Sequence, residues 1–291
     1  MNLQELKEFS PTGVGVRFCR LRVAVSEGGL VLFHHWHEQY EVMYVVHGHA
    51  IFHIDGEMVE ARSGDTLFIP PNCLHGGYNA SNDEFEYVAM VVRPDFLLPP
   101  GSDPEYVRFL SPFLSNQLRL PYVQKASTDN AVLLRRLILE AVQEFENGLP
   151  LRDPLFRCYL QILLGTTARS HLPRQLETRR SSSLPTHHIE SLKRLIQYIE
   201  NNYAEQISVE YAARMVNLST FHFCKIFKRM TGRTLVDFVN LYRVNQATAL
   251  LRETTLTIAD IAEKVGCCNA NYFSKMYFRY KGISPSTARK A

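Results

Sequence analysis

The stretch Ser208-Val-Glu-Tyr-Ala-Ala-Arg-Met-Val-Asn-Leu-Ser-Thr-Phe-His-Phe-Cys-Lys-Ile-Phe-Lys-Arg-Met-Thr-Gly232 is repeated later in the chain as Thr257-Ile-Ala-Asp-Ile-Ala-Glu-Lys-Val-Gly-Cys-Cys-Asn-Ala-Asn-Tyr-Phe-Ser-Lys-Met-Tyr-Phe-Arg-Tyr-Lys-Gly282. Each copy has the pattern of two short helices joined by a turn. Lys225 aligns with Lys275, and one extra residue falls in the second turn. Two helix-turn-helix units in one chain can reach two successive major grooves of DNA. The repeat therefore predicts sequence-specific DNA binding.

Residues that start and end helices recur at the same places in both copies. The N-cap types are Ser208, Ser219, Thr257 and Asn269, and the helix-ending glycines are Gly232 and Gly282. Thr257 and Asp260 have the spacing of a capping box. Apolar residues at helical spacing predict the buried side of each second helix: Phe223, Ile226, Phe227, Phe273, Met276 and Tyr277.

Charge is divided unevenly along the chain. Residues 185–291 hold 15 Lys and Arg against 8 Asp and Glu, whereas the remaining residues hold 17 and 21. A basic C-terminal part after an acidic N-terminal part is expected when only one part of a protein contacts phosphate. A helical hairpin with lysines on a solvated face is the plainer interpretation of either copy alone, and the matched duplication argues against it.

With this repeat, the chain resembles the AraC/XylS family of bacterial transcription regulators over residues 186–290. The resemblance implies that residues at the start of each second helix read base edges: Thr220, Phe221, Cys224 and Lys225, then Ala270, Asn271, Ser274 and Lys275. Lys228, Arg229 and Arg279 are expected to contact phosphate. Cys267 replaces the usual Phe, and Phe278 stands where a Lys usually meets phosphate, which weakens the expected grip of the second unit.

The front of the chain, about residues 14–93, is predicted to form short antiparallel strands. Val42–Val46, Ala50–Ile54 and Thr66–Ile69 are rich in β-branched and aromatic residues. Asp55-Gly56 is a strong hairpin signal. Short strands at this spacing favour an antiparallel sandwich or a jelly-roll barrel, and the jelly-roll barrel is the predicted form. The predicted fold class is therefore α+β in two domains, with an all-α double helix-turn-helix at the end.

The same region resembles the cupin motifs. His35, His37 and Glu41 match the first motif, and His75 matches the second, except that Asn72 replaces a glycine. His35 and His37 lie two apart on a strand and so point to one face. Three imidazoles and a carboxylate suit a divalent transition metal.

Three uses of this cluster stay open: contacts to an organic effector, metal ligation and a structural polar cluster. The resemblance favours the effector, with Phe33, Tyr44 and Tyr78 as aromatic pocket walls and a sugar as the ligand. No cofactor is expected. A sensor of a small molecule needs polar groups that face its effector, and Asn72 is expected to alter the turn before His75. We therefore expect well under one equivalent of metal in the purified protein.

Two helical patterns, about 128–147 and 153–169, follow the barrel, and the resemblance implies that such helices form a homodimer interface. Packing against the barrel is the plainer alternative. The expected division is a sensing domain over 1–172, a linker over 173–186 and a DNA-binding domain over 187–291.

The sequence as a whole predicts a transcription regulator rather than an enzyme. Its expected partners are promoter DNA, a carbohydrate-like effector and RNA polymerase, and activation is favoured. No membrane segment or secretion signal is recognised, and the six cysteines lack C-x-x-C spacing, which suits the cytoplasm. The alternatives are a metal-dependent cupin enzyme with secondary DNA binding, and a constitutive DNA-binding protein with a vestigial barrel.

Overall fold

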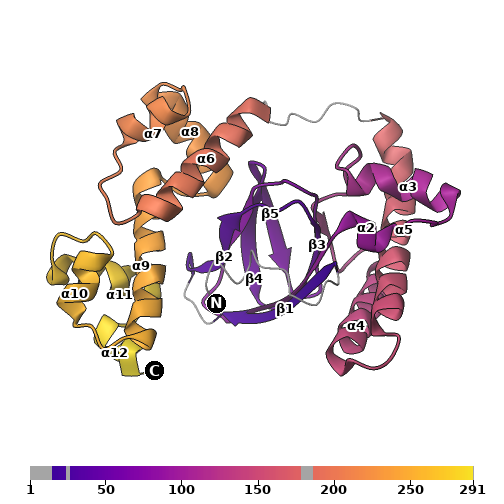
Figure 1. Cartoon of the computed structure of the whole chain (residues 1–291), viewed down its shortest axis with the longest axis horizontal. Coiled ribbons are helices and arrows are strands. Elements are labelled where there is room, and N and C mark those ends of the chain that lie inside the picture. The colour runs from indigo at the N-terminus through magenta and orange to yellow at the C-terminus, as the bar shows by residue number, and fades with distance from the viewer. Residues whose placement is uncertain (1–14, 24–26, 178–185, 291) are drawn as a thin grey trace.

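A computed structural model describes residues 15–23, 27–177 and 186–290 (Figure 1). A β-barrel occupies the middle of the molecule in Figure 1, between helices α2–α5 on one side and α6–α12 on the other. The predicted order of parts, barrel, helices and helix-turn-helix domain, is confirmed. Among these described residues, no helix is both long and apolar enough to cross a membrane.

Within the described part of the chain, nine antiparallel strands form two sheets, as the fold-class prediction requires. One sheet has the order β1-β8-β3-β6-β9 and the other β2-β7-β4-β5. The strands are β1 (Val16–Val23), β2 (Leu30–His35), β3 (Tyr40–His47), β4 (His49–Ile54), β5 (Glu57–Arg62), β6 (Thr66–Ile69), β7 (His75–Asn79), β8 (Phe85–Val92) and β9 (Val123–Gln124). Asp55 and Gly56 both have positive φ between β4 and β5, which is the hairpin turn that their sequence predicts.

Alternate residues of β3 enter two different cores. Met43 and Val45 lie in the barrel interior with Phe52 and Ile54, whereas Val42 and Tyr44 face the helices that follow the barrel. Period-two alternation allows this division, because successive strand side chains point to opposite faces of a sheet. Both faces of this sheet are therefore covered by other parts of the protein.

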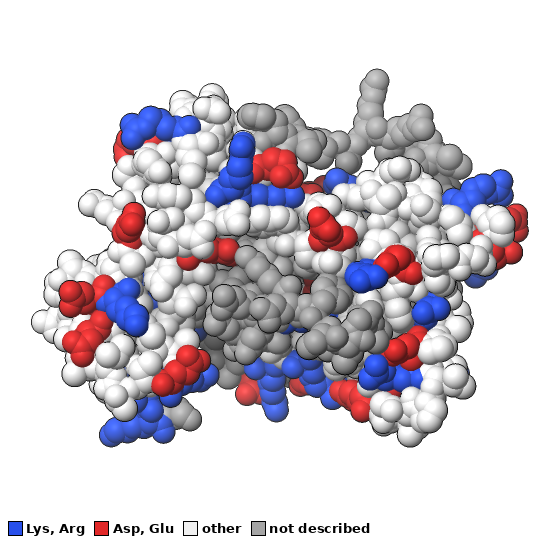
Figure 2. All heavy atoms as spheres, in the orientation of Figure 1, with Lys and Arg blue, Asp and Glu red and all other residues white. Residues whose placement is uncertain are grey.

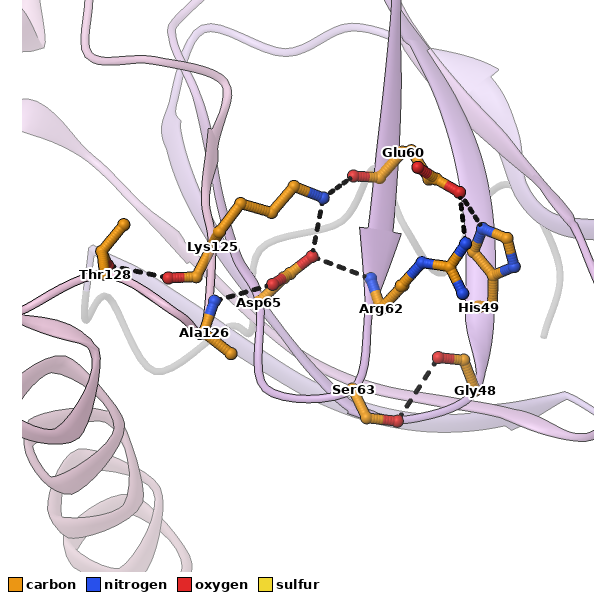
Figure 3. Close-up of polar contacts among 9 residues, drawn as sticks. All are labelled: Gly48, His49, Glu60, Arg62, Ser63, Asp65, Lys125, Ala126 and Thr128. Carbon is orange, nitrogen blue, oxygen red and sulfur yellow. Dashed lines mark hydrogen bonds and ion pairs between the residues drawn. The ribbon is translucent and has the colours of Figure 1, made fainter.

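A buried carboxylate joins the last strand to the barrel (Figure 3). Asp65, in the turn between β5 and β6, accepts hydrogen bonds from the main-chain nitrogens of Arg62 and Ala126. It also accepts one from Lys125 Nζ at 2.9 Å. The segment that leads from β9 toward α4 is thus held to the turn before β6, which fixes where the helices leave the barrel.

Helices α2 (Pro94–Leu97), α3 (Pro104–Leu114), α4 (Ala131–Asn147) and α5 (Arg152–Glu177) pack on this sheet through a shared apolar core. The two predicted helical patterns correspond to α4 and α5. However, α5 continues to Glu177 and so enters the expected linker over 173–186; residues 178–185 of that linker lie outside the described residues. Both helices pack on the barrel, as the plainer alternative expects, and the homodimer interface stays a prediction.

The helical domain consists of α6 (Thr186–Asn202), α7 (Val209–Met215), α8 (Thr220–Thr231), α9 (Leu235–Glu253), α10 (Ile258–Lys264), α11 (Ala270–Lys281) and α12 (Pro285–Lys290). Every predicted cap is confirmed. Side chains of Ser208, Ser219, Thr257 and Asn269 accept from main-chain nitrogens at the helix starts, and Thr257 with Asp260 forms the capping box. Gly232 and Gly282 end α8 and α11 in the left-handed conformation.

Candidate functional site: two reading helices and a polar cluster in the barrel

The two predicted reading helices, α8 and α11, present their first turns to solvent. Thr220, Phe221, Cys224 and Lys225 are exposed on α8, and 75% of the Phe221 surface is accessible. On α11, Asn271 and Lys275 are exposed, and Ala270 and Ser274 are half-buried. Phe223 and Phe273 on the opposite sides are fully buried. Burial of one side thus fixes which residues of each helix remain available for a partner.

The long helix α9 sets the spacing of the two units. Tyr280 at the end of α11 donates a hydrogen bond to Asp237 near the start of α9, at 3.0 Å. Thr248 and Tyr277 hydroxyls lie 3.0 Å apart farther along α9. Arg243 bonds the main-chain oxygens of Tyr203 and Glu205 before the first unit. These contacts hold both reading helices on one rigid element.

Basic and acidic side chains are interspersed on the face of the molecule shown in Figure 2. The expected phosphate contacts Lys228, Arg229 and Arg279 are all exposed. Arg279 lies 3.8 Å from Asp237, which is too distant for a strong hydrogen bond. Arg229, in contrast, donates through Nε to the main-chain oxygen of Gly56 in the barrel. Its guanidinium is thus partly engaged by the barrel in this structure.

A direct contact joins the barrel to the end of α8. The Tyr78 hydroxyl donates to the Thr231 carbonyl at 2.9 Å, and His53 Nδ1 donates to the Arg229 carbonyl at 3.2 Å. The Arg233 guanidinium stacks on the Tyr78 ring, 4.4 Å from its centroid, and donates to the Gly28 carbonyl. We call this set of contacts, which also includes Arg229 with Gly56, the docking contact. These contacts join the barrel directly to the DNA-binding domain.

This placement corrects the expectation that Phe33, Tyr44 and Tyr78 line the barrel interior. Phe33 packs edge-on against Tyr242 of α9, and Tyr78 belongs to the docking contact. Tyr44 faces the helices on the other sheet. The sequence identifies aromatic residues on strands, but each sheet is covered on both faces. An aromatic side chain can therefore be buried either in the barrel interior or against the helices.

His34, which precedes His35 on β2, is also buried. It is buried beneath Phe238 of α9, and neither ring nitrogen has a hydrogen-bond partner among the described residues. Gly76 leaves room for the ring, since a Cβ there would lie 2.5 Å from His34 Nδ1. Burial lowers the pKa of His34 well below its usual range, and nearby His53, His75 and Arg233 lower it further. His34 therefore packs as a neutral ring.

Inside the barrel, the four predicted polar residues converge. His35, His37, Glu41 and His75 place their ligand-type atoms within 4.8 Å of one another. Strand β2 supplies His35 and the paired strand β7 supplies His75, so these two face each other in register. Glu41 Oε2 lies 3.1 Å from Nε2 of both His37 and His75. His75 is fully buried and Glu41 nearly so.

Burial and neighbouring charges act in opposite directions in this cluster. Burial raises the pKa of Glu41, but the ring nitrogens of His37 and His75 lower it more strongly, and its pKa lies well below the usual range. Burial lowers the pKa of His35 well below its usual range, and His75 and His37 add to this. The site therefore contains a buried carboxylate anion beside a neutral imidazole.

The expectation that Asn72 misplaces His75 is wrong. Asn72 has φ 62°, in the left-handed region that glycine adopts most readily. Asn is among the residues that tolerate this region, because its short side chain can hydrogen-bond locally. The turn before β7 keeps its shape, and His75 reaches the cluster.

Comparison with known proteins matches both parts of the chain. A helix-turn-helix domain model covers residues 212–291, and an AraC-like ligand binding domain model covers residues 29–129. The HTH-type transcriptional regulator YdeC of Bacillus subtilis is 25% identical, over 99% of this chain and 96% of its own length. The HTH-type transcriptional activator RhaS of Escherichia coli is also 25% identical, over 88% of this chain and 87% of its own.

Among solved structures, the crystal structure of ToxT from Vibrio cholerae is similar, with a TM-score of 0.43 and 12% identity, covering 95% of this chain and 97% of ToxT. YdeC and RhaS are both named as transcription regulators. The enzyme alternative therefore finds no support, and the chain is a regulator with a ligand-binding domain and a DNA-binding domain.

Proposed function

We propose that this chain, which belongs to the AraC/XylS family of transcription regulators, binds two successive major grooves of promoter DNA under the control of an effector in its barrel. One observation carries the proposal: both reading helices expose their first turns from a single element, α9. Recognition helices contact bases through their N-terminal residues. The exposed residues of both helices therefore lie where a recognition helix reads base edges.

The exposed residues support different base contacts. Lys225 and Lys275 suit guanine, whose O6 and N7 accept hydrogen bonds, and Asn271 suits adenine. Phe221 and Ala270 suit the thymine methyl group, while Thr220, Cys224 and Ser274 complete the reading surface. Lys228 and Arg279 are available for phosphate. Arg229 becomes available once it leaves Gly56.

The effector site is the polar cluster of His35, His37, Glu41 and His75. An apolar barrel with four converging polar groups suits a small ligand with several hydroxyl or carboxylate oxygens, such as a sugar. The aromatic walls expected from the sequence are not part of this site. The assignment of the effector site therefore rests on the polar cluster alone.

Strands β2 and β7 connect the effector site to the DNA-binding domain. On β2, His35 belongs to the polar cluster, and the preceding residue, His34, packs on α9. On β7, His75 faces the cluster and Tyr78 holds the end of α8. A ligand that draws His35 and His75 together therefore shifts the surface on which the first reading helix rests. We infer that this is the route of control.

Activation of transcription is the proposed outcome, as the name of the relative RhaS describes for that protein. Contact with RNA polymerase is part of this proposal. A homodimer is proposed through α4 and α5, which keep apolar side chains on the surface: Val132, Leu133, Leu139, Leu155 and Ile162.

Footprinting of the full chain on DNA selected from a random pool tests the proposal. We expect protection of two major-groove patches about one helical turn apart, roughly 10–10.5 base pairs. The variants Lys225→Ala and Lys275→Ala should each relax selection in one patch only. Protection of a single patch in the parent protein contradicts two working units.

A further inference from the structure

Phe278 is an exposed aromatic residue on the second reading helix, α11. It follows Asn271, Ser274 and Lys275 by seven, four and three residues, so it lies on the same side of the helix, which we call the reading face. Of the Phe278 surface, 59% is accessible. The buried side of α11 is formed by other residues: Phe273, Met276, Tyr277 and Tyr280. The Phe278 ring therefore lies outside the core and extends the reading face by one helical turn.

The internal repeat matches Phe278 with an exposed lysine of the first unit. It aligns Phe278 with Lys228, just as it aligns Lys275 with Lys225. The exposed side of α8 thus carries two lysines where the reading face of α11 carries one lysine and a phenyl ring. A phenyl ring cannot neutralise a phosphate. The second reading face therefore has less charge for the DNA backbone and more apolar surface than the first.

Another cation of α11 is turned away from DNA. Lys281 Nζ donates a hydrogen bond to Asn245 Oδ1 of α9 at 2.6 Å. Burial, with a smaller effect of Arg252, lowers the pKa of Lys281 to about 8. Arg279 is exposed, but it lies 3.8 Å from the Asp237 carboxylate, which offsets part of its charge. Apolar contact is therefore a larger share of what the second unit can offer DNA.

Thymine is the base that presents an apolar group in the major groove. Its C5-methyl group lies there, and Phe is among the side chains that make apolar contact with it. We propose that Phe278 is a specificity-determining residue that contacts a thymine methyl group in the DNA patch bound by the second unit. The contact removes apolar surface of both groups from water. This inference rests on the proposed function, because it requires the second unit to occupy a major groove.

Replacement of thymine by deoxyuridine tests the contact, since it removes the methyl group and keeps O4 and base pairing. Each thymine of the DNA selected by the full chain is replaced in turn, and the patch that loses selection in Lys275→Ala identifies the second unit. We expect one replacement in that patch to weaken binding by the parent about fourfold, the effect of one buried methyl-sized group. Phe278→Ala should bind the DNA with and without that methyl group alike.

Two further variants separate the methyl contact from charge and from the first unit. Phe278→Lys places the charge of Lys228 on the second unit, so it should remove the methyl effect and steepen the salt dependence by about one phosphate contact. Phe221→Ala removes the exposed aromatic side chain of α8 and should leave the methyl effect in the second patch unchanged. Because both aromatic side chains are exposed, we expect all variants to melt with the parent.

The possible outcomes distinguish this inference from the proposed function. A methyl effect that persists in Phe278→Ala overturns the inference, and so does a second patch that is selected without thymine. A parent that protects two patches and shows no methyl effect in the second rejects the role of Phe278 alone. A parent that protects only one patch rejects the proposed function as well.

Discussion

Lys225 and Lys228 lie three residues apart on the exposed side of α8, yet their surroundings give them different roles. Lys225 is in the first half of the helix with Phe221 and Cys224, where a recognition helix meets bases. Lys228 is closer to the C-terminal end, which the barrel holds through Thr231. Position along one helix thus separates base reading from backbone contact.

We expect Lys225→Ala to weaken binding to the preferred site by about 1–3 kcal/mol and to relax selection at one base position. Lys228→Ala should weaken binding to all sequences alike and reduce the salt dependence by about one phosphate contact. Binding isotherms on matched and mismatched DNA at several salt concentrations measure both effects. The same selectivity in the two variants contradicts this division of roles.

At the scale of elements, the second unit depends on its capping box. Thr257 accepts from the Asp260 main chain at 3.1 Å, and Asp260 accepts in return from the Thr257 main chain at 3.0 Å. The hydrogen bonds of Thr257 lower the pKa of Asp260 below its usual value. The start of α10 is therefore fixed by two reciprocal bonds.

Thr257→Ala should destabilise the helical domain by about 1 kcal/mol, because one helix-start N–H loses its acceptor. Ser208→Ala tests the matched position in the first unit, where the cap accepts from Tyr211 without the reciprocal bond. Chemical denaturation of both variants measures the difference. An equal or greater loss in Ser208→Ala indicates that the reciprocal bond adds no stability.

At the scale of the whole molecule, two equivalent glycines separate local strain from docking. Gly232 and Gly282 both end reading helices, with φ of 73° and 72°. A Cβ on Gly232 would lie 2.4 Å from His53 Nε2 of the barrel, whereas a Cβ on Gly282 meets nothing within 4 Å. Alanine at either position incurs the same left-handed strain, about 1–2 kcal/mol.

Gly232→Ala should therefore break the docking contact in addition to straining its helix, and Gly282→Ala should only strain. Small-angle scattering and limited proteolysis of the full chain measure whether the two domains separate. We expect separation in Gly232→Ala alone. If both variants stay equally compact, the docking contact does not hold the domains together in solution.

A second expectation at this scale concerns the coupling of effector and DNA. A ligand that binds the native barrel raises the melting temperature as its concentration exceeds its dissociation constant. His37→Ala should abolish the shift given by an active compound from a sugar screen and leave basal DNA affinity unchanged. A variant that responds like the parent places the effector pocket outside the polar cluster.

The residue pattern predicted much of the DNA-binding site because that site depends on local structure. Caps and helix ends are set by hydrogen bonds within a few residues, so Ser219 and Gly232 locate α8 without knowledge of its neighbours. The helical period then separates buried Phe223 from exposed Phe221. The engagement of Arg229 by Gly56 could not be predicted, because its partner lies 173 residues away in the chain.

The sequence by itself determined the two helix-turn-helix units, the order of the parts and the set of four polar residues, since strand alternation keeps His35 and His37 on one face. Only the tertiary structure decided which face of each sheet lies in the barrel interior and which face packs on helices. Both sheets are covered on both sides, one by the interior and α2–α5, the other by the interior and the DNA-binding domain. An apolar side chain gains burial on either side. Phe33, Tyr44 and Tyr78 were therefore placed by how the domains pack, which no local pattern records.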